Sequence, residues 1–231
     1  GVPRVGQAFL IDIHARLGTA NTKRKARQFQ RGVTYRSICS YCNTHLLGSR
    51  YDPSLVKMAK DVDRVIAERM WLPISLRVQP NRLMRSAVGH LIAHGIGLYR
   101  RASFFRSMSD YFLDEGRVLP PRYTAHAWLY PHNDQFVSQC IGLASAGRST
   151  SLISVLKFYP ICIALFNEAE PDFGSMATLR LDHLLSNDIN AICDVELPVA
   201  GVPPKLWPEA PREMENEAVL HTPLSLGAFR P

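Results

Sequence analysis

The chain has 231 residues, of which 46% are hydrophobic, so it can bury a substantial core. It contains no run of about 18 apolar residues, which argues against a membrane-spanning helix. Its five cysteines are too few for the disulfide scaffold of a small secreted protein, and a cytoplasmic location is expected.

The net charge of +7 is concentrated near the start of the chain. The first 50 residues contain nine Lys or Arg and one acidic residue, whereas the remainder contains 18 basic and 19 acidic residues. Thr22 and Gly32 suit the start and end of a short helix, on which basic side chains recur every four residues. This pattern favours contacts with nucleic-acid phosphates; a solvated basic face without a partner is the alternative. The candidate nucleic-acid-binding residues are Lys23, Arg24, Lys25, Arg27 and Arg31.

Cys39 and Cys42 are separated by two residues in the sequence SICSYCN. Two cysteines on a tight turn at this spacing supply half of the four ligands that a structural zinc ion requires. The same spacing occurs in redox-active pairs at helix starts, and two ordinary thiols in a turn are a further alternative. We interpret Cys39 and Cys42 as zinc ligands, with half of the zinc site visible in the sequence.

Asn43 follows the second cysteine, Gly48 comes next, and Asp52 precedes a helical pattern. Over residues 36–60, this order resembles the second half of HNH-type nucleases, which have a treble-clef zinc fold. The resemblance implies that two such cysteine pairs hold a structural zinc ion. It also implies that an early histidine is the general base for the water that attacks a phosphodiester. The residue after the last cysteine then helps to hold a catalytic metal ion.

Carried over to this chain, the resemblance makes Asn43 a candidate ligand of a catalytic metal, with Mg²⁺ the candidate ion. His14 is the nearest candidate for the base. The chain departs from the family pattern, because no cysteine pair precedes Cys39 and because Asp12 and His14 are not adjacent. We therefore expect either that the first half of the site lies before Gly1, or that the domain binds nucleic acid without cutting it.

Helices are predicted where apolar residues recur at helical spacing. Asp52 and Pro53 are typical of a helix start, and the apolar pattern continues to residue 71. Two more helices are predicted to begin at Asn81 and at Ser103, with a short strand over residues 75–78 before them. These helices form the expected helical layer.

His90 and His94 lie one turn apart on the second of these three helices. That spacing places both imidazoles on one face, as in zinc-binding helices, so they are alternative candidates for the missing zinc ligands. His45 is a third candidate, nearer in sequence to the cysteines. Helix packing is the simpler interpretation of His90 and His94.

The second half of the chain is rich in β-branched and aromatic residues between turn signals, which predicts antiparallel strands. A segment over residues 176–185 is ambiguous. The stretch around His132 offers a possible ligand-lining loop, which would make the protein an enzyme with an unidentified substrate. The predicted strands span residues 123–129, 135–143, 152–158, 161–166 and 191–199.

Together these patterns predict an α+β protein, in which a helical layer packs on an antiparallel sheet and a basic N-terminal segment carries a CxxC turn. The expected organisation is a basic segment at 1–52, an α+β domain at 53–200 and a proline-rich arm at 201–231. The leading hypothesis is a zinc-binding, HNH-like protein that engages nucleic acid, either an endonuclease or a degenerate one, with an oligomer as an open alternative. The competing hypothesis is a non-catalytic subunit whose basic arm docks on an acidic partner.

Overall fold

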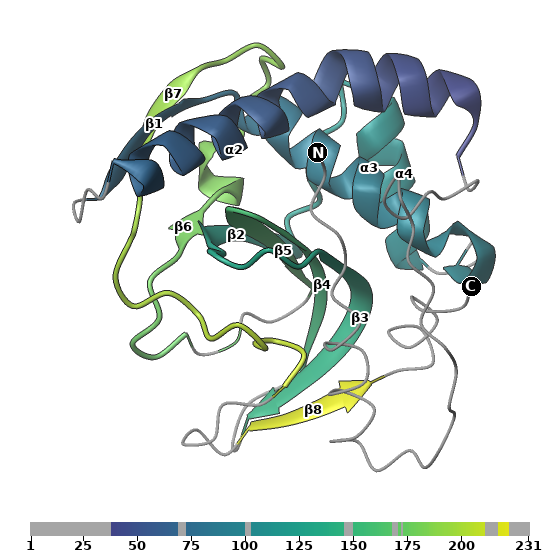
Figure 1. Ribbon diagram of the computed structural model, residues 1–231. Coiled ribbons are helices and arrows are strands. Elements are labelled where there is room, and N and C mark those ends of the chain that lie inside the picture. Colours follow the sequence, from purple (N-terminus) through teal and green to yellow (C-terminus); the bar gives the residue numbers. More distant parts are fainter. Residues whose placement is uncertain are drawn as a thin grey trace, which may run out of the picture.

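The computed structural model describes residues 38–68, 73–99, 103–145, 150–167, 171, 173–210 and 217–221. Figure 1 shows a layer of helices lying across an antiparallel sheet. This arrangement confirms the predicted α+β class and the predicted stacking of helices on strands.

The first helix begins at the cysteine pair. The π-helical segment η1 (Tyr41–Tyr51) continues directly into α2 (Asp52–Ala67), so the turn expected at the cysteines is instead the first turn of a helix. The helix is held in place because apolar residues recurring every three or four positions give it one buried face, although Tyr41 and Val56 remain exposed. Residues 41–52 therefore share a core with the domain that follows, and no boundary is visible at residue 52. The buried residues of this helix are Leu46, Leu47, Tyr51, Leu55, Met58 and Val62.

Two further helices complete the layer. These are α3 (Pro80–Tyr99), which begins with a proline at its first position, and α4 (Ser103–Leu113). Helix α3 packs against both η1 and the sheet. The Gln139 side-chain amide from the sheet donates a hydrogen bond to the Leu91 carbonyl of α3, which fastens the two layers together.

The main sheet has six strands in the order β6-β2-β5-β4-β3-β8, and all neighbouring strands are antiparallel. Four of the predicted strands are present with nearly the expected bounds. The segment over residues 176–185, which the sequence left ambiguous, contains a two-residue strand followed by a 3-10 turn, η2 (Asp182–Leu184). The strands are β2 (Tyr123–Leu129), β3 (Phe136–Ser145), β4 (Ser151–Phe158), β5 (Ile161–Asn167), β6 (Leu179–Arg180) and β8 (Glu217–His221).

A second, two-stranded sheet lies beside α2. It pairs β1 (Ile74–Val78) with β7 (Cys193–Leu197) in antiparallel register, Ile74 opposite Leu197. Buried and exposed residues alternate along β1, as expected for a strand with one face on the core. The short strand predicted over residues 75–78 is confirmed, whereas the strand predicted over 191–199 is shorter than expected and pairs with β1 outside the main sheet.

The main sheet is buried on both faces. Strand β5 shows this most clearly, because every one of its residues is buried. Ile161, Ile163 and Leu165 belong to the core shared with the helices, whereas Cys162 and Phe166 belong to a second core on the opposite face. A strand covered on both sides reads as a continuous apolar run, which is the pattern that the sequence shows here.

The segment that forms the outer cover comes from the proline-rich tail. Trp207 is 1% exposed and packs against Trp128 and Phe166 of the sheet. Farther along, Glu217–His221 adds the edge strand β8 beside β3. An extended arm was expected from residue 201, but residues 203–210 and 217–221 pack as part of the domain. Burial of the large indole of Trp207 in the outer core holds this part of the tail against the sheet.

Buried tyrosines should make the fold sensitive to alkali. Burial, with the nearby Glu115 carboxylate, raises the pKa of Tyr51 to about 12, and burial also raises the pKa of Tyr111 and Tyr130. A raised phenol pKa stabilises the fold fully below about pH 10, and this stability is lost as the pH rises from 10 to 12. We expect denaturant unfolding at pH 11 to show a loss of about 1 kcal/mol per buried tyrosine relative to pH 9.

Tyr51→Phe isolates the contribution of one phenol from that of the lysines, which also titrate in this range. The variant should lose less stability between pH 9 and pH 11 than the wild type does. Equal losses in the two proteins would contradict the assignment of the alkaline effect to Tyr51.

Candidate functional site

The cysteine pair forms the first turn of η1. The Cys39 carbonyl accepts a hydrogen bond from the Asn43 amide at 2.9 Å, which closes the first helical turn. The Cys39 sulfur accepts a second hydrogen bond, from the Cys42 amide at 3.3 Å. The Cys39 sulfur thus accepts from an amide at the start of the helix, where the first amides lack partners within the helix.

The two thiols differ in environment. Cys39 is exposed and Cys42 is half-buried, and both are free of disulfide bonds. The hydrogen bond from the Cys42 amide lowers the pKa of Cys39, whereas burial raises the pKa of Cys42. A thiolate is the form of cysteine that binds metal or attacks as a nucleophile, so Cys39 is the more reactive of the pair.

An apolar pocket of about 170 Å³ adjoins the pair, and both cysteines contribute to its wall. It lies where the start of η1 meets α3 and α4. Apart from one serine, its other walls are apolar, so it suits an apolar group next to the sulfurs. These other lining residues are Ile38, Ile92, Phe105, Ser109, Phe112 and Leu113.

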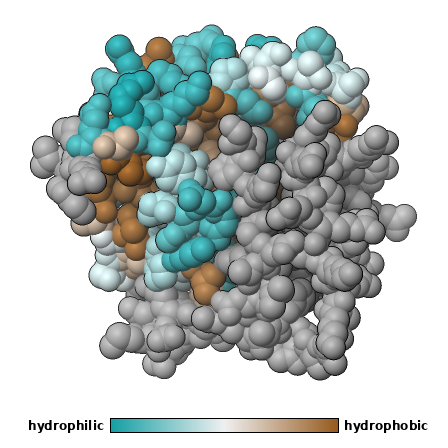
Figure 2. Space-filling model, in the orientation of Figure 1, coloured by the Kyte–Doolittle hydropathy of each residue, from teal (hydrophilic) through white to brown (hydrophobic). Residues whose placement is uncertain are grey.

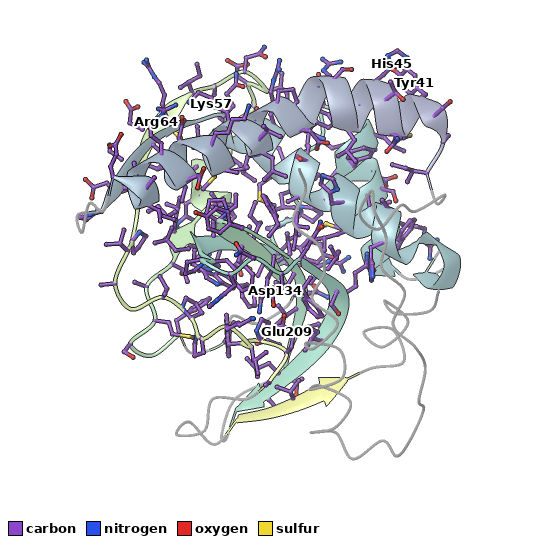
Figure 3. The ribbon with its side chains drawn as sticks, viewed as in Figure 1. Tyr41, His45, Lys57, Arg64, Asp134 and Glu209 are labelled. Carbon is purple, nitrogen blue, oxygen red and sulfur yellow. The ribbon has the colours of Figure 1, made fainter. Side chains whose placement is uncertain are left out.

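The residues after the second cysteine face solvent. Asn43 is exposed, and its role at a metal ion stays a prediction. Tyr41 and His45 point away from the core on the outer side of the helix (Figure 3), with ring centroids 5.3 Å apart. The His45 ring is tilted by 38° against that of Tyr41, and His45 does not join the cysteines in a cluster of ligands.

His90 makes its contact elsewhere. Its Nε2 lies 3.2 Å from Oδ1 of Asp52, and the Ser86 hydroxyl donates to the same oxygen at 2.6 Å. This junction fastens the start of α2 to α3, which agrees with the packing interpretation of His90. Within the described ranges, no three His, Cys, Asp or Glu side chains gather closely enough to hold a metal ion. Neither His90 nor His94 is thus brought into a ligand cluster with Cys39 and Cys42.

The position of the cysteine helix depends on a close approach at Gly89 of α3. A Cβ atom at this position would lie 2.6 Å from both Leu47 of η1 and the Phe112 ring of α4. Gly89→Ala should therefore destabilise the protein by about 1–3 kcal/mol, because overpacking outweighs the better helix propensity of alanine. Chemical denaturation followed by circular dichroism measures this difference.

Gly116→Ala is the matched control, because Gly116 is exposed and its added Cβ would approach only the Asp114 carboxylate, at 3.3 Å. This control should change the free energy of unfolding by less than about 0.5 kcal/mol. If the Gly89 variant is as stable as this control, then α3 can move away from η1 and α4 without lowering the free energy of unfolding.

The other predicted site residues lie outside the part of the chain that the structure describes. This applies to the candidate base His14 and to every residue of the predicted basic stripe. Their placement relative to the cysteine pair stays a prediction. The residues concerned are His14, Lys23, Arg24, Lys25, Arg27 and Arg31.

Sequence reasoning missed a buried charge network on the outer face of the sheet. The Lys157 ammonium is fully buried and donates to Glu209 at 2.5 Å, to the Trp207 carbonyl at 2.7 Å and to the Lys205 carbonyl at 2.8 Å. Burial raises the pKa of Glu209, and the Lys157 charge opposes that rise. The sequence held one signal, because Lys157 is a charged residue inside a predicted strand that is otherwise uncharged, LISVLKF.

The loop around His132 belongs to the same network. Asp134 accepts a hydrogen bond from the Tyr130 hydroxyl at 3.0 Å and pairs with Lys205 at 3.0 Å. Figure 3 shows Asp134 and Glu209 close to the sheet rather than on the outer helix. The loop therefore fastens the tail to the sheet, which gives its polar residues a structural role.

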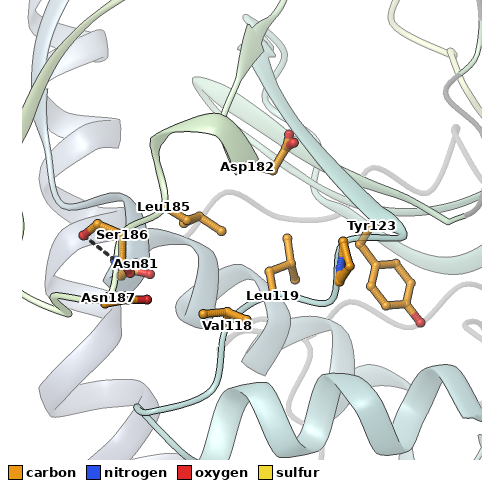
Figure 4. Close-up of a pocket in the computed structure, with 9 residues that line it drawn as sticks. Asn81, Val118, Leu119, Tyr123, Asp182, Leu185, Ser186 and Asn187 are labelled. Atoms are coloured by element: carbon orange, nitrogen blue, oxygen red, sulfur yellow. Dashed lines mark hydrogen bonds between the residues drawn. The ribbon is translucent and has the colours of Figure 1, made fainter.

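A second pocket, of about 320 Å³, lies between α3 and the loops that follow α4 and β6 (Figure 4). The Asn81 amide on its wall donates to the carbonyls of Ser186 at 2.9 Å and of Asp188 at 3.0 Å. These bonds hold the loop against the helix, so the polar groups of the wall are engaged in structure. Neither cysteine lies in this pocket.

No family model, no curated protein and no solved structure matches the chain. No helix in the described part of the chain is both long and apolar enough to cross a membrane. The cysteine pair and the charge distribution of the sequence are therefore the features that bear on function.

Proposed function

We propose that the protein is a zinc-binding, HNH-like protein that engages nucleic acid in the cytoplasm. The observation that supports this proposal is the presentation of Cys39 and Cys42 on one helical turn, with Asn43 exposed beside them. The helix behind this turn is fixed in the core by Leu46 and Leu47, so the pair is held rigidly at the surface. Rigid presentation favours a metal site, because ligands that are already ordered lose little entropy on binding.

The two cysteines that are present are suitable zinc ligands. Two thiols, one of them with a lowered pKa, would supply two of four tetrahedral ligands. The other two ligands would come from residues outside the described ranges or from a second copy of the chain. Asn43 would hold a catalytic Mg²⁺, which would supply positive charge at the cleaved phosphate, and His14 would be the base if the protein cuts.

Zinc content is the direct test of the metal proposal. The purified chain should contain about one zinc ion per chain by elemental analysis, or one per two chains if a dimer shares the site. Cys39→Ser and Cys42→Ser should each lose the metal. Cys193→Ser is the control and should retain it, because Cys193 lies apart on the small sheet. A zinc-free wild type, or retention in the Cys39 and Cys42 variants, would contradict the proposal.

Nucleic-acid binding should depend on salt and on the basic stripe. The triple variant Lys23→Ala, Arg27→Ala, Arg31→Ala should lose most of its affinity, and the slope of log affinity against log salt should fall by about three. The matched control replaces three exposed bases of α2, where acidic neighbours offset the charge: Lys57 and Arg64 both approach Asp61.

That control, Lys57→Ala, Lys60→Ala, Arg64→Ala, removes the same charge and should change affinity much less. Figure 3 labels Lys57 and Arg64 on α2, and all three bases are exposed. Figure 2 shows that the outer side of the helical layer is mostly hydrophilic. Equal losses in both triple variants would mean that net charge alone matters. Binding to an acidic protein without binding to nucleic acid would favour the interaction-subunit hypothesis.

A further inference from the structure

We propose that Cys39 and Cys42 form a reversible disulfide by exchange with a low-molecular-weight disulfide, with Cys39 as the attacking thiol and Cys42 as the resolving thiol. This activity goes beyond zinc binding and does not require it. The sequence left a redox pair as an alternative to zinc ligation, one that Tyr41 and the Asn-Thr-His after Cys42 did not favour. The structure places them on the first turn of a helix.

Three features of the site carry the proposal. The Cys39 sulfur is exposed and accepts the Cys42 amide hydrogen bond at 3.3 Å, which points it over the first helical turn. The Cys42 thiol is half-buried, and its residue lies on the same turn, since its backbone amide contacts the Cys39 sulfur. The two cysteines therefore lie one helical turn apart, and Cys39 is the more open of the two to a reagent from solvent.

The apolar pocket supplies the third feature. Both cysteines border it, so it lies beside the position at which a group attached to Cys39 would sit. Cys162 and Cys193 line neither pocket described above, and Cys162 is fully buried. The geometry thus singles out one pair among the described cysteines.

The exchange balances in two steps. In the first, the Cys39 thiol loses its proton, its sulfur attacks one sulfur of the small disulfide, and one small thiol leaves after taking up a proton. In the second, the Cys42 sulfur loses its proton and attacks the Cys39 sulfur, and the second small thiol leaves. The two cysteines are oxidised by two electrons, and the small disulfide is reduced to two thiols.

If the pair also holds zinc, as proposed above, disulfide formation and zinc binding compete for the same two sulfurs. A disulfide consumes both sulfur ligands, so the oxidised chain would not retain the metal, and bound zinc would protect the pair from oxidation. The redox state and the metal would then be mutually exclusive.

The test uses the full chain, treated with a chelator to remove metal and then equilibrated with mixtures of reduced and oxidised glutathione. Trypsin cleaves after Arg36 and Arg50 and leaves both cysteines in one peptide, SICSYCNTHLLGSR. We expect this peptide to lose two hydrogen masses as the proportion of oxidised glutathione rises, and to regain them on reduction. Cys42→Ser should instead accumulate a glutathione adduct on residue 39, and Cys39→Ser should form neither product.

Cys193→Ser is the control and should oxidise like the wild type. The proposal is overturned if the peptide stays reduced in the mixtures that label other thiols, or if Cys39→Ser captures glutathione as readily as Cys42→Ser. Zinc content is measured separately on the reduced chain. A chain that oxidises without binding zinc would contradict the zinc proposal alone. A chain that binds zinc without forming the disulfide would contradict the disulfide proposal alone.

Discussion

Lys157→Ala should lower the free energy of unfolding by about 3–5 kcal/mol. The ammonium group is 0% exposed and holds Glu209 and two backbone carbonyls of the tail. Its removal leaves the Glu209 carboxylate buried without its counter-charge, and a carboxylate in this position cannot regain water without opening the outer core. Urea unfolding of wild type and variant measures the loss.

A double replacement separates the value of the pair from the cost of breaking it. Lys157→Met with Glu209→Leu removes both charges while roughly keeping the side-chain volumes. The double variant should be more stable than either single variant, because no uncompensated charge remains. If the two single losses simply add in the double variant, the residues are not energetically coupled, and the ion pair is not what holds the tail.

Trp207→Ala should cost about 3–5 kcal/mol, because it removes the largest side chain that the tail contributes to the outer core. The indole packs with its ring centroid 5.6 Å from that of Trp128 and 5.7 Å from that of Phe173. The residual cavity would be lined by aromatic rings that cannot collapse together, so the loss should fall at the upper end for a core truncation. Thermal and denaturant unfolding should shift together.

Leu113→Ala is the control for Trp207→Ala, because Leu113 is apolar but 54% exposed at the end of α4. It should change stability by less than about 0.5 kcal/mol. A mild effect of Trp207→Ala, close to that of this control, would mean that residues 203–210 contribute little to the fold and that the tail behaves as the arm expected from its prolines.

Periodicity in the sequence was sufficient for most of the secondary structure. Strand β2 has the predicted bounds, and β4 and β5 differ by one residue at an end, because β-branched and aromatic residues between turn signals leave few alternatives. The helix starts were harder. Asp52 and Pro53 satisfy the rules for a first turn, yet the helix begins before residue 52, since buried Leu46 and Leu47 extend its apolar face.

The sequence by itself determined the α+β class, the antiparallel strands, the cysteine pair and the segregation of basic charge, because each depends on local spacing or composition. Only the tertiary structure decided which residues that are distant in the sequence come into contact. It paired His90 with Asp52 rather than with the cysteines, and it buried Lys157 against Glu209. These contacts join residues 38 and 52 positions apart, and no local pattern encodes such a pairing, because it depends on how whole elements pack.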